Sequence, residues 1–346
     1  MRASALLVTA LLCAAAVGCS LSKKPARPAP GEAPAADEAN GDTPPARAAP
    51  APRTIDWSVF DSTSVRNPTD GSLEGGVPLP LEAPGLRFNP ARDPAARYGT
   101  LEMVRGLVRA ADRVDRELGG LPLTVNDLSL EHGGPIPHHR SHQSGRDVDT
   151  LFYQLGPDGE PIESVGAFFD PSGAAVDFHD LGDPSDDVAL RLDVPRTWLF
   201  VQALIEDASA QLQRIFVAEH LRSLLLEYAR EQDVPEATVA RFADMTCQPG
   251  YPHDDHFHLR FFCAPDDVAK GCRDSPPMYP WQRDKLQAEG VRSRPLAAQR
   301  KKAKAKVVTH EEARKAAGSM DAEVERWLEL RKGWIHQPSP GRAYCP

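Results

Sequence analysis

Apolar residues recur at helical spacing in several segments of the chain. From Tyr98 to Leu118 they stand three or four positions apart with charged residues between them, and Gly119 and Gly120 follow. This pattern predicts an amphipathic helix that ends at the two glycines. Similar spacing predicts helices over 196–210 and 218–232, another that begins at Pro235, and a helical segment over 310–332.

Alternating or short apolar runs predict strands between these helices. The segments are 121–130, 150–153, 212–217 and 255–262. In the last segment His256, His258 and Arg260 share one face, while aromatic and aliphatic side chains occupy the other. Helices and strands interleave without a regular βαβ repeat. We therefore expect an α+β fold with a mostly antiparallel central sheet, flanked by helices and carrying the site chemistry described below.

The first 19 residues have the pattern of a bacterial export signal. Arg2 precedes an almost unbroken apolar run, Leu6 to Val17, which is shorter than the about 20 residues of a membrane span. The sequence around Cys19 resembles a lipobox, which predicts cleavage before Cys19 and its lipidation. The alternative is plain cleavage near Ala16. With the lipid anchor, the protein is expected in the periplasm, attached to the outer membrane.

Composition divides the rest of the chain. Residues 20–54 are rich in Pro and Ala and predict a disordered tether. Residues 55–285 suffice for one large domain, and 286–346 form a partly helical extension with a basic run at 300–306. We interpret that run as a solvated linker before a packing helix; a weak hold on anionic wall polymer or lipid is the alternative. A net charge of −9 gives no support for nucleic-acid binding.

The cysteines of the exported part predict two disulfides. Beyond Cys19, four remain: Cys247, Cys263, Cys272 and Cys345. An even number in an oxidising compartment favours disulfides over free thiols, with three possible connectivities. We expect Cys263 to pair with Cys272, its close neighbour in sequence, which leaves Cys247 for Cys345.

Two clusters of His and Asp carry the candidate chemistry. Six residues separate His142 from Asp149, and the second cluster spans His253 to His258. On a strand, His256 and His258 point to the same side, so that both imidazoles can face one ion. A His and Asp pair from the first cluster and one His from the second would give three protein ligands. Three ligands leave a fourth position for water, which is the arrangement of catalytic zinc. Taken alone, each motif is more often a surface or hydrogen-bonded group.

Several spaced segments resemble one family. They are Ser141–Asp149, Arg214–Val217 and His253–Arg260, preceded by Arg97–Gly99 and the Gly133–Gly134 turn. In this order they are similar to the penicillin-insensitive murein endopeptidases, within the superfamily of lysostaphin-like and D-Ala-D-Ala metallopeptidases. The resemblance covers about 87–272. Residues 55–285 are accordingly interpreted as a zinc metallopeptidase domain.

The resemblance implies roles for individual residues. It makes His142, Asp149 and His258 the zinc ligands, with His139 as a further ligand or a hydrogen-bonded neighbour. It makes His253 and His256 catalytic groups that hold the attacking water or stabilise the oxyanion, and it ranks Asp255 below them as a base. Arg260 and Arg140 are expected to bind substrate carboxylates, whereas Arg146 is favoured as a structural ion pair. A second zinc is doubtful, because 193–196 offers no His.

The implied activity is zinc-dependent hydrolysis of peptide crosslinks in peptidoglycan, at the bond between D-alanine and meso-diaminopimelate. Penicillin should not inhibit it. Two alternatives stay open. One is a D,D-carboxypeptidase or dipeptidase of the same superfamily, and the other is a non-catalytic lipoprotein that binds peptidoglycan through a retained zinc fold.

Overall fold

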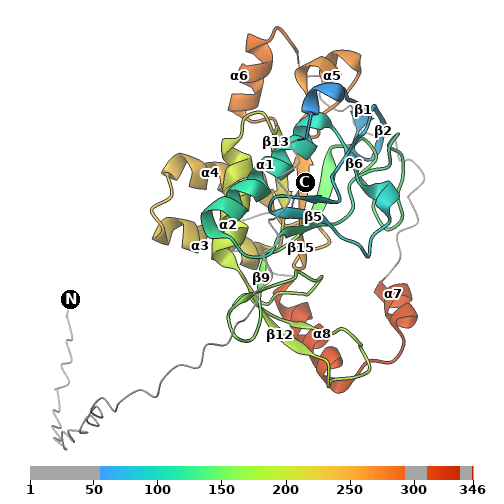
Figure 1. Ribbon diagram of the computed structural model, residues 1–346, viewed down its shortest axis with the longest axis vertical. Helices are drawn as coiled ribbons and strands as arrows, with labels where there is room; N and C mark the ends of the chain where they lie inside the picture. Colours follow the sequence, from blue (N-terminus) through green and yellow to red (C-terminus); the bar gives the residue numbers. More distant parts are fainter. Residues whose placement is uncertain (1–54, 293–309, 336–344, 346) are drawn as a thin grey trace, which may run out of the picture. The chain divides into compact units, whose positions relative to one another are not determined.

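The computed structural model describes residues 55–292, 310–335 and 345 (Figure 1). The predicted signal, lipobox Cys19, tether and basic run lie outside these residues. Within the described part, no helix is long and apolar enough to span a membrane. Its helices are α1 (Leu101–Leu118), α2 (Val194–Glu206), α3 (Glu219–Glu231), α4 (Glu236–Met245), α5 (Pro265–Lys270), α6 (Pro280–Ala288), α7 (His310–Ala317) and α8 (Ala322–Trp334), with 3-10 turns at Trp57–Val59 and Pro94–Ala96.

A seven-stranded sheet forms the centre of the fold. Its order is β14 (Thr246–Cys247), β13 (Leu212–Phe216), β15 (His256–Phe261), β8 (Asp147–Leu151), β7 (Leu123–Val125), β5 (Leu86–Phe88) and β4 (Glu82–Ala83). The pairings of β15 with β13 and β8 are antiparallel, but β13 pairs with β14, and β5 with β7, in parallel. The α+β class is confirmed. The prediction of a mostly antiparallel sheet was wrong, because the sheet is mixed.

The parallel pairs have a topological cause. Neighbouring parallel strands need a long crossover, usually helical, to return the chain to the same edge. Here α1 lies between β5 and β7 in the sequence, and α3 and α4 lie between β13 and β14. Helices that the apolar pattern predicted are therefore the crossovers that place these strands in parallel.

Smaller sheets flank the central one. A four-stranded sheet has the order β10 (Pro161–Ile162), β9 (Gln154–Leu155), β12 (Val188–Leu192) and β11 (Ala174–Asp177). Two further antiparallel pairs join β1 (Thr63–Asn67) to β2 (Asp70–Glu74) and β3 (Val77–Pro78) to β6 (Tyr98–Gly99). In Figure 1, β9 and β12 lie beside α8, below the central sheet.

Helix α1 illustrates how the local sequence builds the core. Its apolar stripe, including Val104, Leu107, Ala111 and Val114, is buried in the main hydrophobic cluster. The helix ends where Gly119 takes a φ of +63°, a left-handed conformation that glycine adopts without a steric cost. Burial of this stripe fixes α1 against α2 and the sheet.

Both expected disulfides are present in the structure. Cys263 bonds to Cys272 next to α5, and Cys247 of β14 bonds to Cys345 near the C-terminus. The second bond closes a loop of 98 residues, which should restrict the unfolded chain. It ties the C-terminal extension to the central sheet.

Candidate metal centre

The register between β8 and β15 brings the two sequence clusters together. In this antiparallel pair His258 stands opposite Asp149, and Arg260 stands opposite Asp147. Residues two apart on a strand share a face, so all four side chains lie on the same side of the sheet. A motif near residue 150 and a motif near residue 256 thus form one site.

His142 approaches this face from the loop before β8. Its imidazole is fully buried, and its Nδ1 lies 2.8 Å from the carbonyl oxygen of Leu128. That carbonyl can only accept a hydrogen bond, so Nδ1 donates, and whenever the ring is neutral Nε2 carries the lone pair. Nε2 lies 3.5 Å from Asp149 Oδ1. The tautomer held by Leu128 is therefore the one that a metal ligand needs.

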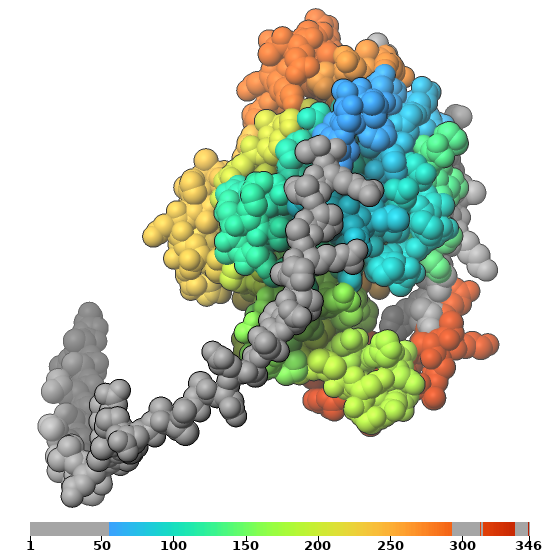
Figure 2. Space-filling model, viewed as in Figure 1, coloured from blue at the N-terminus to red at the C-terminus, as the bar shows by residue number. Residues whose placement is uncertain are grey.

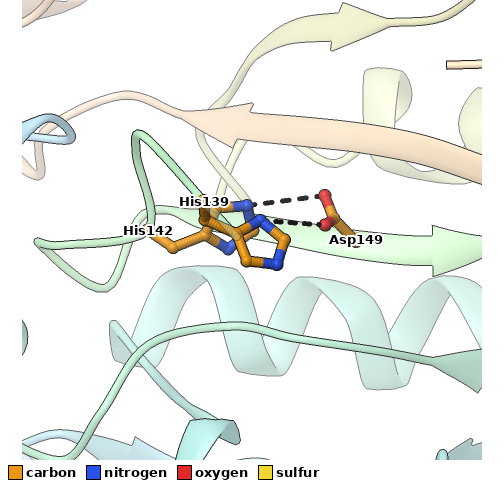
Figure 3. A group of neighbouring side chains, drawn as sticks. All are labelled: His139, His142 and Asp149. Carbon is orange, nitrogen blue, oxygen red and sulfur yellow. Dashed lines mark ion pairs between the residues drawn. The ribbon is translucent and has the colours of Figure 1, made fainter. Parts of the chain in front are cut away.

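Asp149 is the centre of a group of imidazoles. Its Oδ1 lies 3.4 Å from Nδ1 of His258 and 3.6 Å from Nε2 of His256, and its Oδ2 lies 3.5 Å from Nδ1 of His139 (Figure 3). Burial alone would raise the pKa of Asp149, but charges on His142, His256 and His258 hold that pKa well below its usual value. The carboxylate is therefore ionised, as a ligand must be.

Unpartnered polar atoms test whether these residues fit a metal. Buried Nε2 of His142, Oδ1 of Asp149 and Nε2 of His258 have no hydrogen-bond partner in the structure. Buried polar atoms are normally satisfied, and each exception needs an explanation. Imidazole nitrogens and carboxylate oxygens are ligand-type atoms that a bound cation would satisfy, so the residues present fit a metal ion.

Asp147 is a neighbour that the sequence analysis did not name. Two sets of three residues each have ligand atoms within 4.8 Å of one another. One set is His139, His142 and Asp149, and the other is His142, Asp147 and His258. Asp147, however, already accepts two hydrogen bonds from Arg260, at 2.7 and 2.8 Å. Oδ1 of Asp149 has no hydrogen-bond partner, so Asp149 is the better candidate ligand. The alternation of β8 was the signal that could have placed Asp147 on the same face.

His139 lies at the edge of the same group. Its Nε2 is 3.2 Å from Oδ2 of Asp127, and its ring centroid is 4.3 Å from that of His142. A carboxylate partner of this kind orients an imidazole whether it binds the metal or only lines the site. Both predicted roles of His139 stay open, and Asp127 joins the site as its partner.

The other two histidines have opposite electrostatic environments. His256 Nδ1 lies 2.8 Å from Oδ1 of Asp255; although burial opposes its charge, Asp255 and Asp149 raise the pKa of His256 to about 9. Burial, with the charges of His256 and His258, lowers the pKa of His253 to about 3. Their ring centroids are 4.8 Å apart. In the metal-free protein, a protonated and a neutral imidazole therefore stand side by side, and Asp255 contacts the protonated one.

The three arginines differ in how they are engaged. Arg146 is fully buried and donates to Asp274, Ser64 and two backbone carbonyls, so the expected structural ion pair is found. Arg260 is held by Asp147 and lies over the ring of Phe216, 5.2 Å from its centroid. Arg140 is exposed. Substrate contacts of Arg260 and Arg140 stay predictions.

The comparisons with known proteins agree with this site. The model of the family described as penicillin-insensitive murein endopeptidase matches residues 64–313. The chain belongs to this family. Two relatives carry that same name: one from Pectobacterium atrosepticum is 28% identical over 229 residues, 62% of this chain and 70% of the relative. The other, from Yersinia enterocolitica, is 27% identical over 222 residues, 60% and 69% of the two chains.

The match includes every residue of the candidate metal centre. It begins in β1 and ends in α7, so it is wider than the 87–272 that the motifs alone suggested. Helix α8 and Cys345 lie beyond its end. The murein endopeptidase family therefore accounts for the sheet and the histidine cluster, and the last part of the chain is an addition to what the family match covers.

Proposed function

We propose that this protein is a zinc-dependent hydrolase that cleaves the D-alanyl–meso-diaminopimelyl crosslinks of peptidoglycan. The observation that carries the proposal is the buried group formed by His142, Asp149 and His258, each with an unpartnered ligand-type atom, in a chain of the murein endopeptidase family. Two imidazoles and one carboxylate are a ligand set typical of catalytic zinc, which keeps one position for water.

The chain's residues prepare the site for the ion. Leu128 fixes the tautomer of His142, the β8–β15 register fixes His258 opposite Asp149, and Asp147 lies 3.5 Å from Nε2 of His258. With two neutral imidazoles and one carboxylate, a bound Zn²⁺ keeps net positive charge, polarises a carbonyl oxygen and lowers the pKa of water toward about 7. These contacts orient the ligands before the ion arrives.

His256 and His253 are placed to handle charge and protons. A protonated His256, oriented by Asp255, can donate a hydrogen bond to the oxygen that becomes negative as the peptide carbonyl is attacked. Neutral His253, whose Nδ1 lies 2.7 Å from the carbonyl oxygen of Tyr251, presents its other nitrogen as an acceptor. It can accept a hydrogen bond from the attacking water and so orient it.

A digestion experiment tests the proposal. Purified protein is incubated with crosslinked muropeptide dimers, with and without a zinc chelator, and the products are identified by mass spectrometry. The expected products are two monomers, formed only without chelator or after zinc is restored. Release of terminal D-alanine from monomers, with dimers intact, would instead indicate a D,D-carboxypeptidase. Binding to sacculi without any zinc-dependent cleavage would indicate a non-catalytic wall-binding protein.

We also propose that the protein works in the periplasm, held at the outer membrane by a lipid on Cys19. The apolar run, the lipobox-like sequence and the Pro/Ala-rich residues 20–54 support this location, since a tether lets a domain reach from membrane to wall. In a bacterial host, wild-type protein should fractionate with outer membrane and incorporate labelled fatty acid. Cys19→Ser should abolish the label; labelling that persists contradicts the assignment.

A further inference from the structure

Helix α8 lies beyond the family match but reaches the segment that carries the catalytic histidines. Its Arg331 donates from Nε and Nη2 to the two oxygens of Asp254, at 2.8 and 2.7 Å. Asp254 is fully buried and Arg331 is 6% exposed. Two parallel hydrogen bonds between a guanidinium and a carboxylate fix both distance and orientation. The pair therefore joins α8 rigidly to the residue after His253.

Further contacts hold α8 in place around this pair. Trp334 Nε1 donates to Asp254 Oδ2 at 3.3 Å, and Trp327 Nε1 donates to the carbonyl oxygen of Phe168 at 3.3 Å. The Arg331 guanidinium lies 3.8 Å from the ring centroid of Phe168. At the other end of the helix, the N–H of Asp321 donates to the carbonyl oxygen of Leu181 at 2.7 Å. Figure 2 shows the red C-terminal region next to the yellow-green segment before α2.

The segment held by Asp254 is one that needs support. His253 has a φ of +48°, a left-handed conformation that is rare and costly for a residue other than glycine. Its carbonyl accepts from the N–H of Ala218 at 3.1 Å, and the carbonyl of Asp254 accepts from the N–H of Phe169 at 2.9 Å. Backbone contacts thus hold one side of the segment, and the Asp254 carboxylate is the side-chain contact that faces α8.

The geometry points to Arg331 as a positioning residue for catalysis: through Asp254 it holds residues 253–256 so that His253 and His256 face Asp149. The inference rests on the proposed function, because it concerns the histidines that would act on the crosslink. It assigns to the C-terminal extension a part in the active site, which neither the family match nor the zinc motifs include.

A general anchoring role would not require this pair. The Cys247–Cys345 bond and the hydrogen bond from Gln248 to the carbonyl of Ile335, at 2.7 Å, already hold the end of the extension to the sheet. Burying two charges has a large desolvation cost, and a bidentate pair offsets it only in a well-defined geometry. Such a pair next to a strained catalytic segment is suited to alignment more than to attachment.

The test compares three variants of the full-length protein. Arg331→Met removes the charge and keeps the stem, Arg331→Lys keeps the charge without the bidentate geometry, and Arg326→Met removes an exposed ion pair from the same helix as the control. Each is measured for zinc content, for kcat and KM on muropeptide dimers, and for hydrogen–deuterium exchange of peptides that cover 250–256 and α1.

For Arg331→Met we expect kcat to fall about 10- to 100-fold, the range of a misplaced general acid–base group. KM should change less than about twofold, zinc should stay near one per chain, and exchange over 250–256 should rise about tenfold while α1 is unchanged. Arg331→Lys should recover part of kcat, and Arg326→Met should match the parent.

Each other outcome is decisive. A folded Arg331→Met with parental kcat and parental exchange over 250–256 overturns the inference and leaves the proposed function intact. If Arg331→Met does not fold, Arg331→Lys decides: a reduced kcat supports positioning, and a parental kcat overturns it, because neutralising the Asp254 charge is then sufficient. If the parent itself shows no zinc-dependent cleavage, the proposed function fails, and exchange over 250–256 still shows whether Arg331 orders the segment.

Discussion

Replacing His256 by alanine separates catalysis from metal binding. The Nε2 atom of His256 lies 3.6 Å from Asp149 Oδ1, at the edge of the ligand group, while its Nδ1 is held by Asp255 at 2.8 Å. If His256 acts on the transition state, His256→Ala should keep zinc near one per chain and lose most activity. The alternative is that His256 is a fourth ligand, which would close the position needed by water.

The size of the loss follows from the group removed. In the proposed mechanism, the half-buried and protonated His256 donates a hydrogen bond to the reacting carbonyl, as one donor of an oxyanion hole does. Removing such a donor lowers kcat by about 10² to 10³, or roughly 3 to 4 kcal/mol. The Asp255 carboxylate also loses its ion-pair partner, which should lower the free energy of unfolding by about 1 to 3 kcal/mol. The loss of transition-state stabilisation should therefore be at least as large as the loss in the free energy of unfolding.

The assay combines zinc analysis, circular dichroism and kcat on muropeptide dimers, with the exposed His179→Ala as a matched control. Loss of zinc together with activity would show that His256 is a ligand. Parental activity with full zinc would refute the catalytic role and leave His253 or Asp255 as the group that matters.

Three further results are expected. His258→Ala should reduce zinc well below half an ion per chain, because two ligands remain; a content near one, by metal analysis, would contradict the assignment. Penicillin should leave dimer cleavage unchanged, since residues 55–346 contain no Ser-x-x-Lys motif, and inhibition at ordinary concentrations would argue for a serine enzyme. Burial raises the pKa of Asp267 from 3.8 to about 6, so its charge costs stability above about pH 6 and not below about pH 4. Asp267→Asn should therefore raise the free energy of unfolding at pH 7.5 by about 1 to 3 kcal/mol, and Tm with it, but should not do so at about pH 4. The same Tm difference between variant and parent at about pH 7.5 and at about pH 4 would refute this.

Local periodicity was sufficient for much of the fold. The stripe of α1 and the two faces of β15 depend on neighbouring residues in the sequence, and both lie where the pattern placed them. The two disulfides followed from the number and spacing of the cysteines. The parallel strand pairs did not follow, because they depend on which strands meet after a helical crossover, and no local pattern contains that information.

The candidate site was predictable in its histidines and not in their supports. His142, Asp149 and His258 stand in short motifs, and the structure brings them close to one another, while their role as zinc ligands stays a prediction. Asp127 beside His139, Asp147 beside Arg260 and Arg331 beside Asp254 were missed. Each of these partners lies at least 12 residues from the residue it contacts. From the sequence alone, such a charged residue cannot be distinguished from an exposed one.

The cross-strand register of β8 and β15 also limits how the family can vary in length. His258 lies opposite Asp149, and Arg260 opposite Asp147, only while the two strands keep one alignment. A single inserted residue within either strand would turn every following side chain to the other face and separate both pairs at once. Insertions and deletions among relatives should therefore be absent from these two strands and gather in connections such as 178–187, where no ligand candidate lies.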